Sequence, residues 1–273
     1  MIPLRDNIPS RTTPFVNYLM IAACAWVFVQ QLNEQPGQPS LVEQYGMIPQ
    51  RVRSPEKPIV LTDQKVERTR FGPQVSVVER RAADSAVPEK LTLLTCIFLH
   101  GGWMHFIGNM WFLMIFGDNV EDRLGHFGYL IFYLGCGVAA SAAHMAASPE
   151  STIPTIGASG AIAGVMGAYL LLYPRAKVLT LVPILIFFHM LVLPAPLFLG
   201  VWFVIQFFQG TFAITSTQAS GVAWWAHIGG FVTGVIVAAV LRPTRAVRPR
   251  VEVVRPGTDR ISGYRVYPHR NRR

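Results

Sequence analysis

The stretch Thr155–Gly164, TIGASGAIAG, places the hydroxyl of Ser159 among residues that have almost no side chain. A serine hydroxyl is a weak nucleophile until a neighbouring base takes its proton, and neutral histidine is the usual base near pH 7. The small neighbours Gly157, Ala158 and Gly160 would leave room for an extended peptide backbone to reach it. Serine among small residues also occurs where membrane helices simply pack closely. The stretch is therefore a candidate nucleophile site that needs a base and further polar groups.

Two other segments supply those groups. The segment WWAHIGGFVTG contains His227, a candidate general base, and HGGWMHFIGNMW contains His100, His105 and Asn109. His105 and Asn109 are separated by one helical turn, so both can point at one oxygen. Side-chain donors of this kind, together with free backbone amides at a helix start, stabilise the oxyanion of acyl transfer. These residue types are those of a serine hydrolase site, in which a neighbouring histidine activates Ser159; His227 could equally be a hydrogen-bonded histidine at the membrane interface.

The elements that carry these residues are apolar. Of the 273 residues, 51% are hydrophobic and 14% are charged, and the mean hydropathy is +0.36. Soluble domains have about 25% charged residues, and a membrane-crossing helix needs roughly 20 mostly apolar ones. We predict an all-α polytopic membrane protein, a bundle of six helices from the runs Phe15–Leu32, Trp103–Gly117, Phe127–Ala147, Ile156–Tyr173, Val178–Phe212 and Val222–Leu241.

The fifth run, Val178–Phe212, is too long for one crossing and contains three prolines. It is either two spans or one span that follows a broken interfacial segment. The positions of Lys and Arg favour the second alternative, because cytoplasmic loops are enriched in these residues. With six spans, the loops Ala147–Thr155 and Thr211–Gly221, which contain no Lys or Arg, both lie outside. The prediction is a cytoplasmic-membrane protein with both termini in the cytoplasm.

This organisation divides the chain into a cytoplasmic segment (1–14), a membrane domain (15–241) with a long external loop (33–99), and a basic, disordered cytoplasmic tail (242–273). The tail holds ten Arg against Glu252 and Asp259, which is a net charge of +8 out of +9 for the whole chain. A basic segment beside a span is a topology signal that also attracts anionic lipid headgroups. We therefore predict contact with membrane lipid and no nucleic-acid partner.

Six spans also bring the polar residues to one depth. The second, fourth and sixth spans run from outside to inside, and each carries its polar residues at its beginning. At 1.5 Å per helical residue, these groups lie within roughly 10 Å of the outer hydrocarbon boundary. Polar groups inside a membrane are costly and commonly functional. The spacing of Gly160 with Gly164 and of Gly230 with Gly234 is typical of closely packed helices, which a Ser–His hydrogen bond would require.

The combined motifs resemble those of the rhomboid intramembrane serine proteases. The matching segments are HGGWMHFIGNMW (100–111), VEDRLG (120–125), GASG (157–160) and AHIGGFVTG (226–234), within a resemblance that covers most of 15–241. It implies a dyad of Ser159 as nucleophile and His227 as general base, without a cofactor or metal. It also implies an oxyanion site of His105, Asn109 and the Ser159 backbone amide. The remaining residues that it places nearby in structural roles are His100, Gly157, Gly160, Gly230 and Gly234. The implied substrates are membrane-anchored proteins with one or more spans.

The sequence departs from the family pattern at two places. Many members carry an aromatic residue four positions after the nucleophile, where it can stack on the catalytic histidine, and here that position is Ala163. Trp225 is one candidate to orient His227 in its place. Many members also carry a Trp–Arg pair in the first external loop, but residues 33–99 contain no Trp.

Other functions fit the sequence less well. A non-catalytic adaptor that binds client helices would not need both Ser159 and His227. A transporter would need a polar pathway on the cytoplasmic side and commonly shows an inverted repeat, and neither is visible. A zinc site is disfavoured because no His-Glu-x-x-His motif is present. His126, His144 and His189 are predicted to be structural or interfacial, and Asp118 and Asp122 to be solvated.

Overall fold

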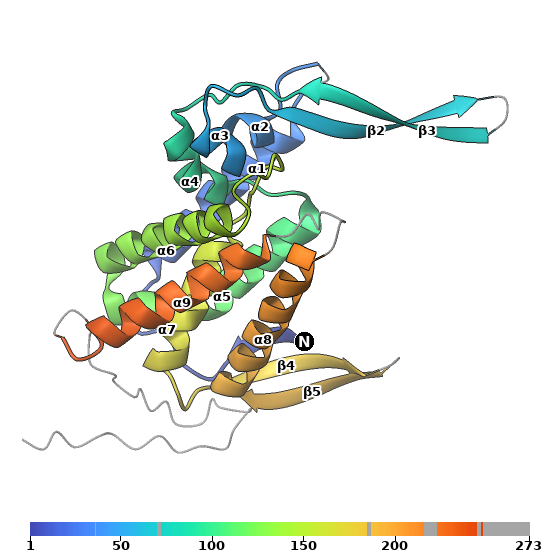
Figure 1. The fold of residues 1–273 in the computed structure, drawn as a ribbon. Coiled ribbons are helices and arrows are strands. Elements are labelled where there is room, and N and C mark those ends of the chain that lie inside the picture. Colours follow the sequence, from blue (N-terminus) through green and yellow to red (C-terminus); the bar gives the residue numbers. More distant parts are fainter. Residues whose placement is uncertain (36, 70–71, 185–186, 216–222, 245–246, 248–273) are drawn as a thin grey trace, which may run out of the picture.

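The computed structural model describes residues 1–35, 37–69, 72–184, 187–215, 223–244 and 247, and its core is helical (Figure 1). The long helices are α1 (Phe15–Leu32), α5 (Trp103–Leu124), α6 (His126–Ala147), α7 (Ser159–Leu172), α8 (Ala195–Thr215) and α9 (Trp224–Leu241). The short helices at one end of this bundle are α2 (Leu41–Tyr45), α3 (Pro49–Arg53), α4 (Thr92–Thr95) and the 3₁₀ turns Glu89–Leu91 and Cys96–Phe98. Most of the tail predicted at 242–273 lies outside the described residues.

The helices differ in the length of their apolar segments. α1, α6 and α9 are each long and apolar enough to cross a membrane, and α5 makes a fourth candidate with the segment Glu89–Phe98, from which it is bent by 80°. α7 and the Ala195–Gln209 part of α8 are shorter apolar helices. The structure therefore has three to four candidate spans among its described residues, and the count of six crossings stays a prediction.

The chain is not wholly helical, so the all-α class needs correction. The first half of the predicted fifth span is an antiparallel hairpin of β4 (Lys177–Ile184) and β5 (Phe187–Pro194), and β1 (Ile2–Asp6) pairs with β4. Proline disrupts a helix interior, and β-branched and aromatic residues favour strands. Pro183 is tolerated in β4 because β1 pairs with β4 only as far as Leu181.

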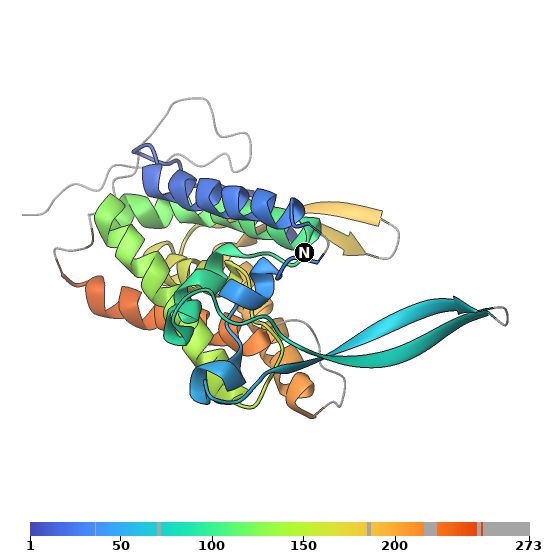
Figure 2. The ribbon, with the colours of Figure 1, turned by 90° about the horizontal axis from the view of Figure 1, so that it is seen from above.

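The predicted external loop also contains strands. β2 (Val60–Thr69) and β3 (Gly72–Arg81) form an antiparallel hairpin in which Val60 is opposite Arg81. Two views at right angles show this hairpin projecting away from the helical bundle (Figures 1 and 2). At its base, the buried carboxylate of Glu43 accepts hydrogen bonds from Arg80 at 2.6 and 3.1 Å, and this guanidinium lowers the pKa of Glu43. The described part of the segment 33–99 is thus a folded subdomain and not an irregular loop.

α7 is the most buried helix of the bundle, because 11 of its 14 residues are buried. Its small residues allow α9 to approach backbone to backbone. A Cβ atom on Gly230 would collide with the carbonyl oxygen of Gly160, and one on Gly234 would collide with Gly164. Only glycine fits at these two crossings, and this close contact sets the distance between the first turns of the two helices.

Two buried carboxylates of the VEDRLG motif attach the N-terminal segment to α5. Glu121 accepts hydrogen bonds from the backbone amides of Val16 and Asn17 at 3.0 and 2.8 Å, and so satisfies free N–H groups in the first turn of α1. Asp122 accepts from the amides of Arg11 and Thr12 at 2.5 and 3.0 Å. Asp122 is only 3% exposed, so the prediction that it is solvated was wrong. The sequence pattern could not show that a distant backbone segment needs this acceptor.

The attachment of β1 predicts a pH-dependent stability. Asp6 accepts hydrogen bonds from Tyr169 at 2.5 Å and Asn119 at 3.0 Å, and burial raises its pKa from 3.8 to about 7. The folded state therefore binds the proton more tightly than the unfolded state, and the free energy of unfolding falls as pH rises between these two values. We expect Asp6→Asn to reduce this dependence, which in the wild type should span at least about 2 °C in midpoint temperature.

Thermal unfolding of the detergent-solubilised protein over this pH range measures the effect. Asp84→Asn is the matched control, because Asp84 is exposed and pairs only with the exposed Arg81 among the contacts described. A pH dependence that persists unchanged in Asp6→Asn would contradict the assignment.

Candidate active site

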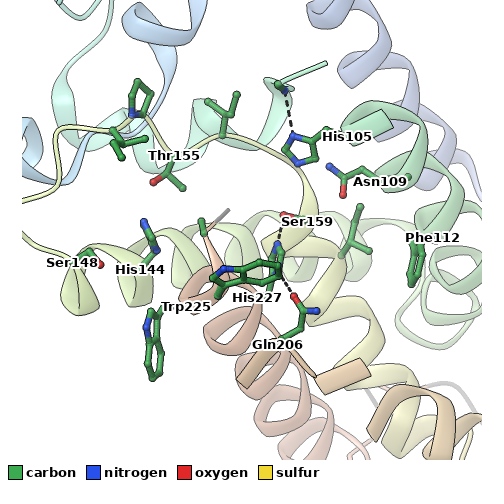
Figure 3. A pocket seen from close by; sticks show the side chains of 18 of the residues that line it. His105, Asn109, Phe112, His144, Ser148, Thr155, Ser159, Gln206, Trp225 and His227 are labelled. Carbon is green, nitrogen blue, oxygen red and sulfur yellow. Dashed lines mark hydrogen bonds between the residues drawn. The ribbon is translucent and has the colours of Figure 1, made fainter. Parts of the chain in front are cut away.

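Ser159 is the first residue of α7, and His227 lies in the first turn of α9. The Ser159 Oγ and the His227 Nε2 are 2.7 Å apart, within hydrogen-bond distance (Figure 3). The helix begins at Ser159 because the preceding chain turns sharply at Gly157, whose φ of +122° favours glycine. A Cβ atom at Gly157 would also lie 2.7 Å from the Nε2 of His105. The small residues before Ser159 are thus required by both backbone geometry and space.

His105 and Asn109 lie on the face of α5 that lines the same cavity. The backbone amide of Gly101 donates to the Nδ1 of His105 at 3.2 Å, so in the neutral ring the proton resides on Nε2. This N–H points toward Gly157 and the start of α7. The Nδ2 of Asn109 is buried and makes no hydrogen bond to the described part of the chain. Two donors from one helix face therefore remain available beside Ser159.

His100 supports this arrangement from behind. It is 2% exposed, its Nδ1 lies 3.2 Å from the carbonyl oxygen of Phe98, and its backbone amide donates to Gln31 at 2.9 Å. Its ring packs edge-on against that of His105, with 5.3 Å between centroids. His100 therefore helps to fix the ring of His105 and does not itself line the cavity.

The cavity has a volume of about 760 Å³ and lies between the helices of the bundle. Its lining includes residues of α5, α6, α7, α8 and α9, among them His105, Asn109, His144, Ser159, Gln206 and His227. Among the described residues that line it, none is a carboxylate. Within the part of the chain that the structure describes, no group of three or more His, Cys, Asp or Glu residues could hold a metal ion. Its chemistry is thus that of hydroxyl, imidazole and amide groups.

Sequence reasoning missed two residues of the cavity. Gln206 of α8 places its Oε1 at 2.6 Å from the Nδ1 of His227, and His144 of α6, predicted to be structural or interfacial, lines the cavity. In addition, the rings of Trp202 and Trp224 lie 6.0 and 5.9 Å from that of His227, centroid to centroid. Gln206, Trp202 and Trp224 thus surround the imidazole. The sequence feature that could have pointed to Gln206 is that it is the single amide side chain in an otherwise apolar run.

A bundle of apolar helices that encloses a serine–histidine pair defines the class as a helical membrane protein with a candidate hydrolase site. A family model described as Rhomboid domain matches residues 88–244, which is more than half of the chain. The protein therefore belongs to the rhomboid family. The matched region includes the five helices α5 through α9, which carry the site residues, and excludes α1 and the β2–β3 hairpin.

Curated relatives support this membership. RHOMBOID-like protein 4 of Arabidopsis thaliana is 33% identical over 156 residues, which are 55% of this chain and 33% of the relative. The rhomboid protease GluP of Bacillus subtilis is 34% identical over 151 residues, which are 55% of this chain and 25% of the relative. The putative rhomboid protease YdcA of the same organism is 35% identical over 78 residues, or 29% and 39% of the two chains. The matched part of the chain spans about a quarter to two fifths of the length of these curated relatives.

Proposed function

We propose that the protein is an intramembrane serine endopeptidase that hydrolyses peptide bonds in or near the transmembrane segments of membrane-anchored proteins. The observation that carries this proposal is the 2.7 Å hydrogen bond between Ser159 and His227 inside a cavity of a membrane-helix bundle. The rhomboid relatives named as proteases support it.

The geometry supports a two-step acyl transfer. His227 Nε2 takes the proton of Ser159 Oγ while this oxygen attacks the substrate carbonyl carbon, and the carbonyl oxygen becomes an oxyanion. His105, Asn109 and the Ser159 backbone amide stabilise the oxyanion as hydrogen-bond donors. The amide is available because the first N–H groups of a helix have no intrahelical acceptor. His227 then gives the proton to the leaving amine, and water hydrolyses the acyl-enzyme by the same steps in reverse.

The surroundings of the nucleophile indicate what kind of peptide fits. A helical backbone hides its carbonyl groups in hydrogen bonds, so a substrate helix must unwind locally before Ser159 can attack. The small residues Gly157 and Ala158 leave space for backbone but not for bulk, because His105 lies directly beyond Gly157. We infer a preference for small residues at the scissile bond, in a segment that reaches the cavity from the external side of the cytoplasmic membrane. Both termini of the enzyme are then cytoplasmic.

Labelling by a fluorophosphonate probe tests the proposal without a known substrate. We expect the purified protein in detergent to be labelled at one residue, Ser159, and the label to be lost after heating or in Ser159→Ala. A folded protein that retains client-helix binding but is never labelled would instead support a non-catalytic adaptor.

The oxyanion donors lead to a second prediction. Asn109→Ala removes a buried amide donor, and we expect kcat to fall by about a hundredfold with a small change in KM, because the donor acts on charge that develops only in the transition state. Steady-state cleavage of a single-span substrate measures both constants. An unchanged kcat, with the fold intact by thermal unfolding, would remove Asn109 from the oxyanion site.

A further inference from the structure

Gln206 is an unusual residue for its position. It lies in α8, is 7% exposed, and is the one amide side chain between Ala195 and Phe208, where the remaining residues are apolar. A buried amide inside a membrane helix is unfavourable unless its polar atoms find partners. Its Oε1 lies 2.6 Å from the Nδ1 of His227, the ring nitrogen that does not face Ser159 (Figure 3). The ring is thus held between two side chains from two other helices.

We propose that Gln206 is the positioning residue of the catalytic base, which makes the site a Ser159–His227–Gln206 array with a neutral third member. This inference rests on the proposed function. An amide oxygen only accepts hydrogen bonds, so the His227 Nδ1 that faces it must carry the proton. The Nε2 of a neutral ring is then left with a free lone pair directed at Ser159. Gln206 therefore selects the tautomer that can act as a general base.

The choice of an amide follows from the environment. A carboxylate in this position would also accept from Nδ1, but its charge would be buried among apolar helices, which is expensive. The amide oxygen provides the same acceptor without a charge. Trp202, one turn before Gln206 on α8, and Trp224 on α9 flank the ring and restrict its rotation. The hydrogen bond and the two indoles together hold the ring in place.

The other groups that act on His227 do not provide this function. His105 from α5 and His144 from α6 are the titratable side chains that influence it electrostatically. No Asp or Glu is among the described residues that line the cavity, and α7 contributes Ser159 as the hydrogen-bond partner on the opposite nitrogen. Within the described residues, Gln206 is thus the partner that the structure gives to Nδ1.

Three variants test the inference through the rate of fluorophosphonate labelling of Ser159 as a function of pH. Gln206→Leu removes the acceptor, and we expect the labelling rate at pH 7 to fall by about tenfold to a hundredfold, with kcat of cleavage affected more than KM. Gln206→Glu restores an acceptor, so it should recover most of the rate. Its charge favours the imidazolium, so the acidic limb of the profile should move up by about one pH unit. Gln209→Leu is the matched control, because Gln209 lies on the same helix and is exposed.

A purely structural role of Gln206 would lower stability in Gln206→Leu without moving the pH profile in Gln206→Glu. The inference is overturned if Gln206→Leu labels at the wild-type rate, or if Gln206→Glu leaves the profile in place. Nitrogen-15 NMR of selectively labelled histidine gives a readout that needs no activity. The His227 ring should be the Nδ1–H tautomer in wild type and a mixture in Gln206→Leu. Failure of the proposed function is separate, because wild type itself would then show no labelling at Ser159.

Discussion

Replacing Ser159 by alanine is expected to reduce cleavage of a co-expressed single-span membrane protein by at least about a thousandfold, to the limit of detection. Alanine removes the oxygen that forms the acyl bond, and no other hydroxyl among the described residues is hydrogen-bonded to His227. His227→Ala should give a loss of similar size. The two changes combined should be no worse than either alone, because nucleophile and base act as one unit.

Stability must be measured beside activity, because Ser159 lies at the start of a buried helix. We expect the alanine variants to unfold within a few degrees of wild type, since the lost hydrogen bond is worth only about 1 kcal/mol. Ser148→Ala is the matched control, because Ser148 lines the same cavity from the end of α6. Retained cleavage in Ser159→Ala, or equal loss in Ser148→Ala, would reject the dyad.

Local hydrophobic pattern explains why several helices could be predicted closely. The first predicted span and α1 have the same bounds, Phe15–Leu32, because Pro14 precedes the run and polar residues follow it. α6 begins one residue before its predicted start because Gly125, with φ of +71°, separates it from α5. Such boundaries depend on residues adjacent in sequence. The direction of each predicted span, and the position of the polar residue along it, likewise suggest that Ser159 and His227 lie at a similar depth in the membrane and could meet.

What the sequence could not show depends on pairing between distant segments. β1 and β4 are more than 170 residues apart, and nothing in the pattern of Ile2–Asp6 indicates a strand that joins Lys177–Ile184. Asp122 is predicted as a solvated charge until the backbone segment that it binds is known. Gln206 is similar. Its residue type marks it as unusual, but only the packing of α8 against α9 shows that it faces His227 and not lipid.

The second large effect is expected from Gly234→Ala, although this substitution adds only one methyl group. A single methyl group at this position would collide with the backbone of Gly164, and backbone atoms cannot move aside as a flexible side chain can. α9 must therefore shift away from α7. Overpacking of this kind costs about 1–3 kcal/mol or more, so we expect a clear fall in the midpoint of thermal unfolding. Gly135→Ala on α6 is the matched control, because nothing lies within 4 Å of its added Cβ.

The shift of α9 in Gly234→Ala should also lower the rate of the reaction at Ser159. Gly230 and Gly234 fix how closely the start of α9 approaches α7, and the 2.7 Å between His227 and Ser159 depends on that approach. A misplacement of about 1 Å can cost a hundredfold in rate. At a temperature where both variants are folded, Gly234→Ala should label with fluorophosphonate at least about tenfold more slowly than Gly135→Ala. Equal stability and equal labelling in the two variants would mean that the glycine contact between α7 and α9 does not position the serine and the histidine.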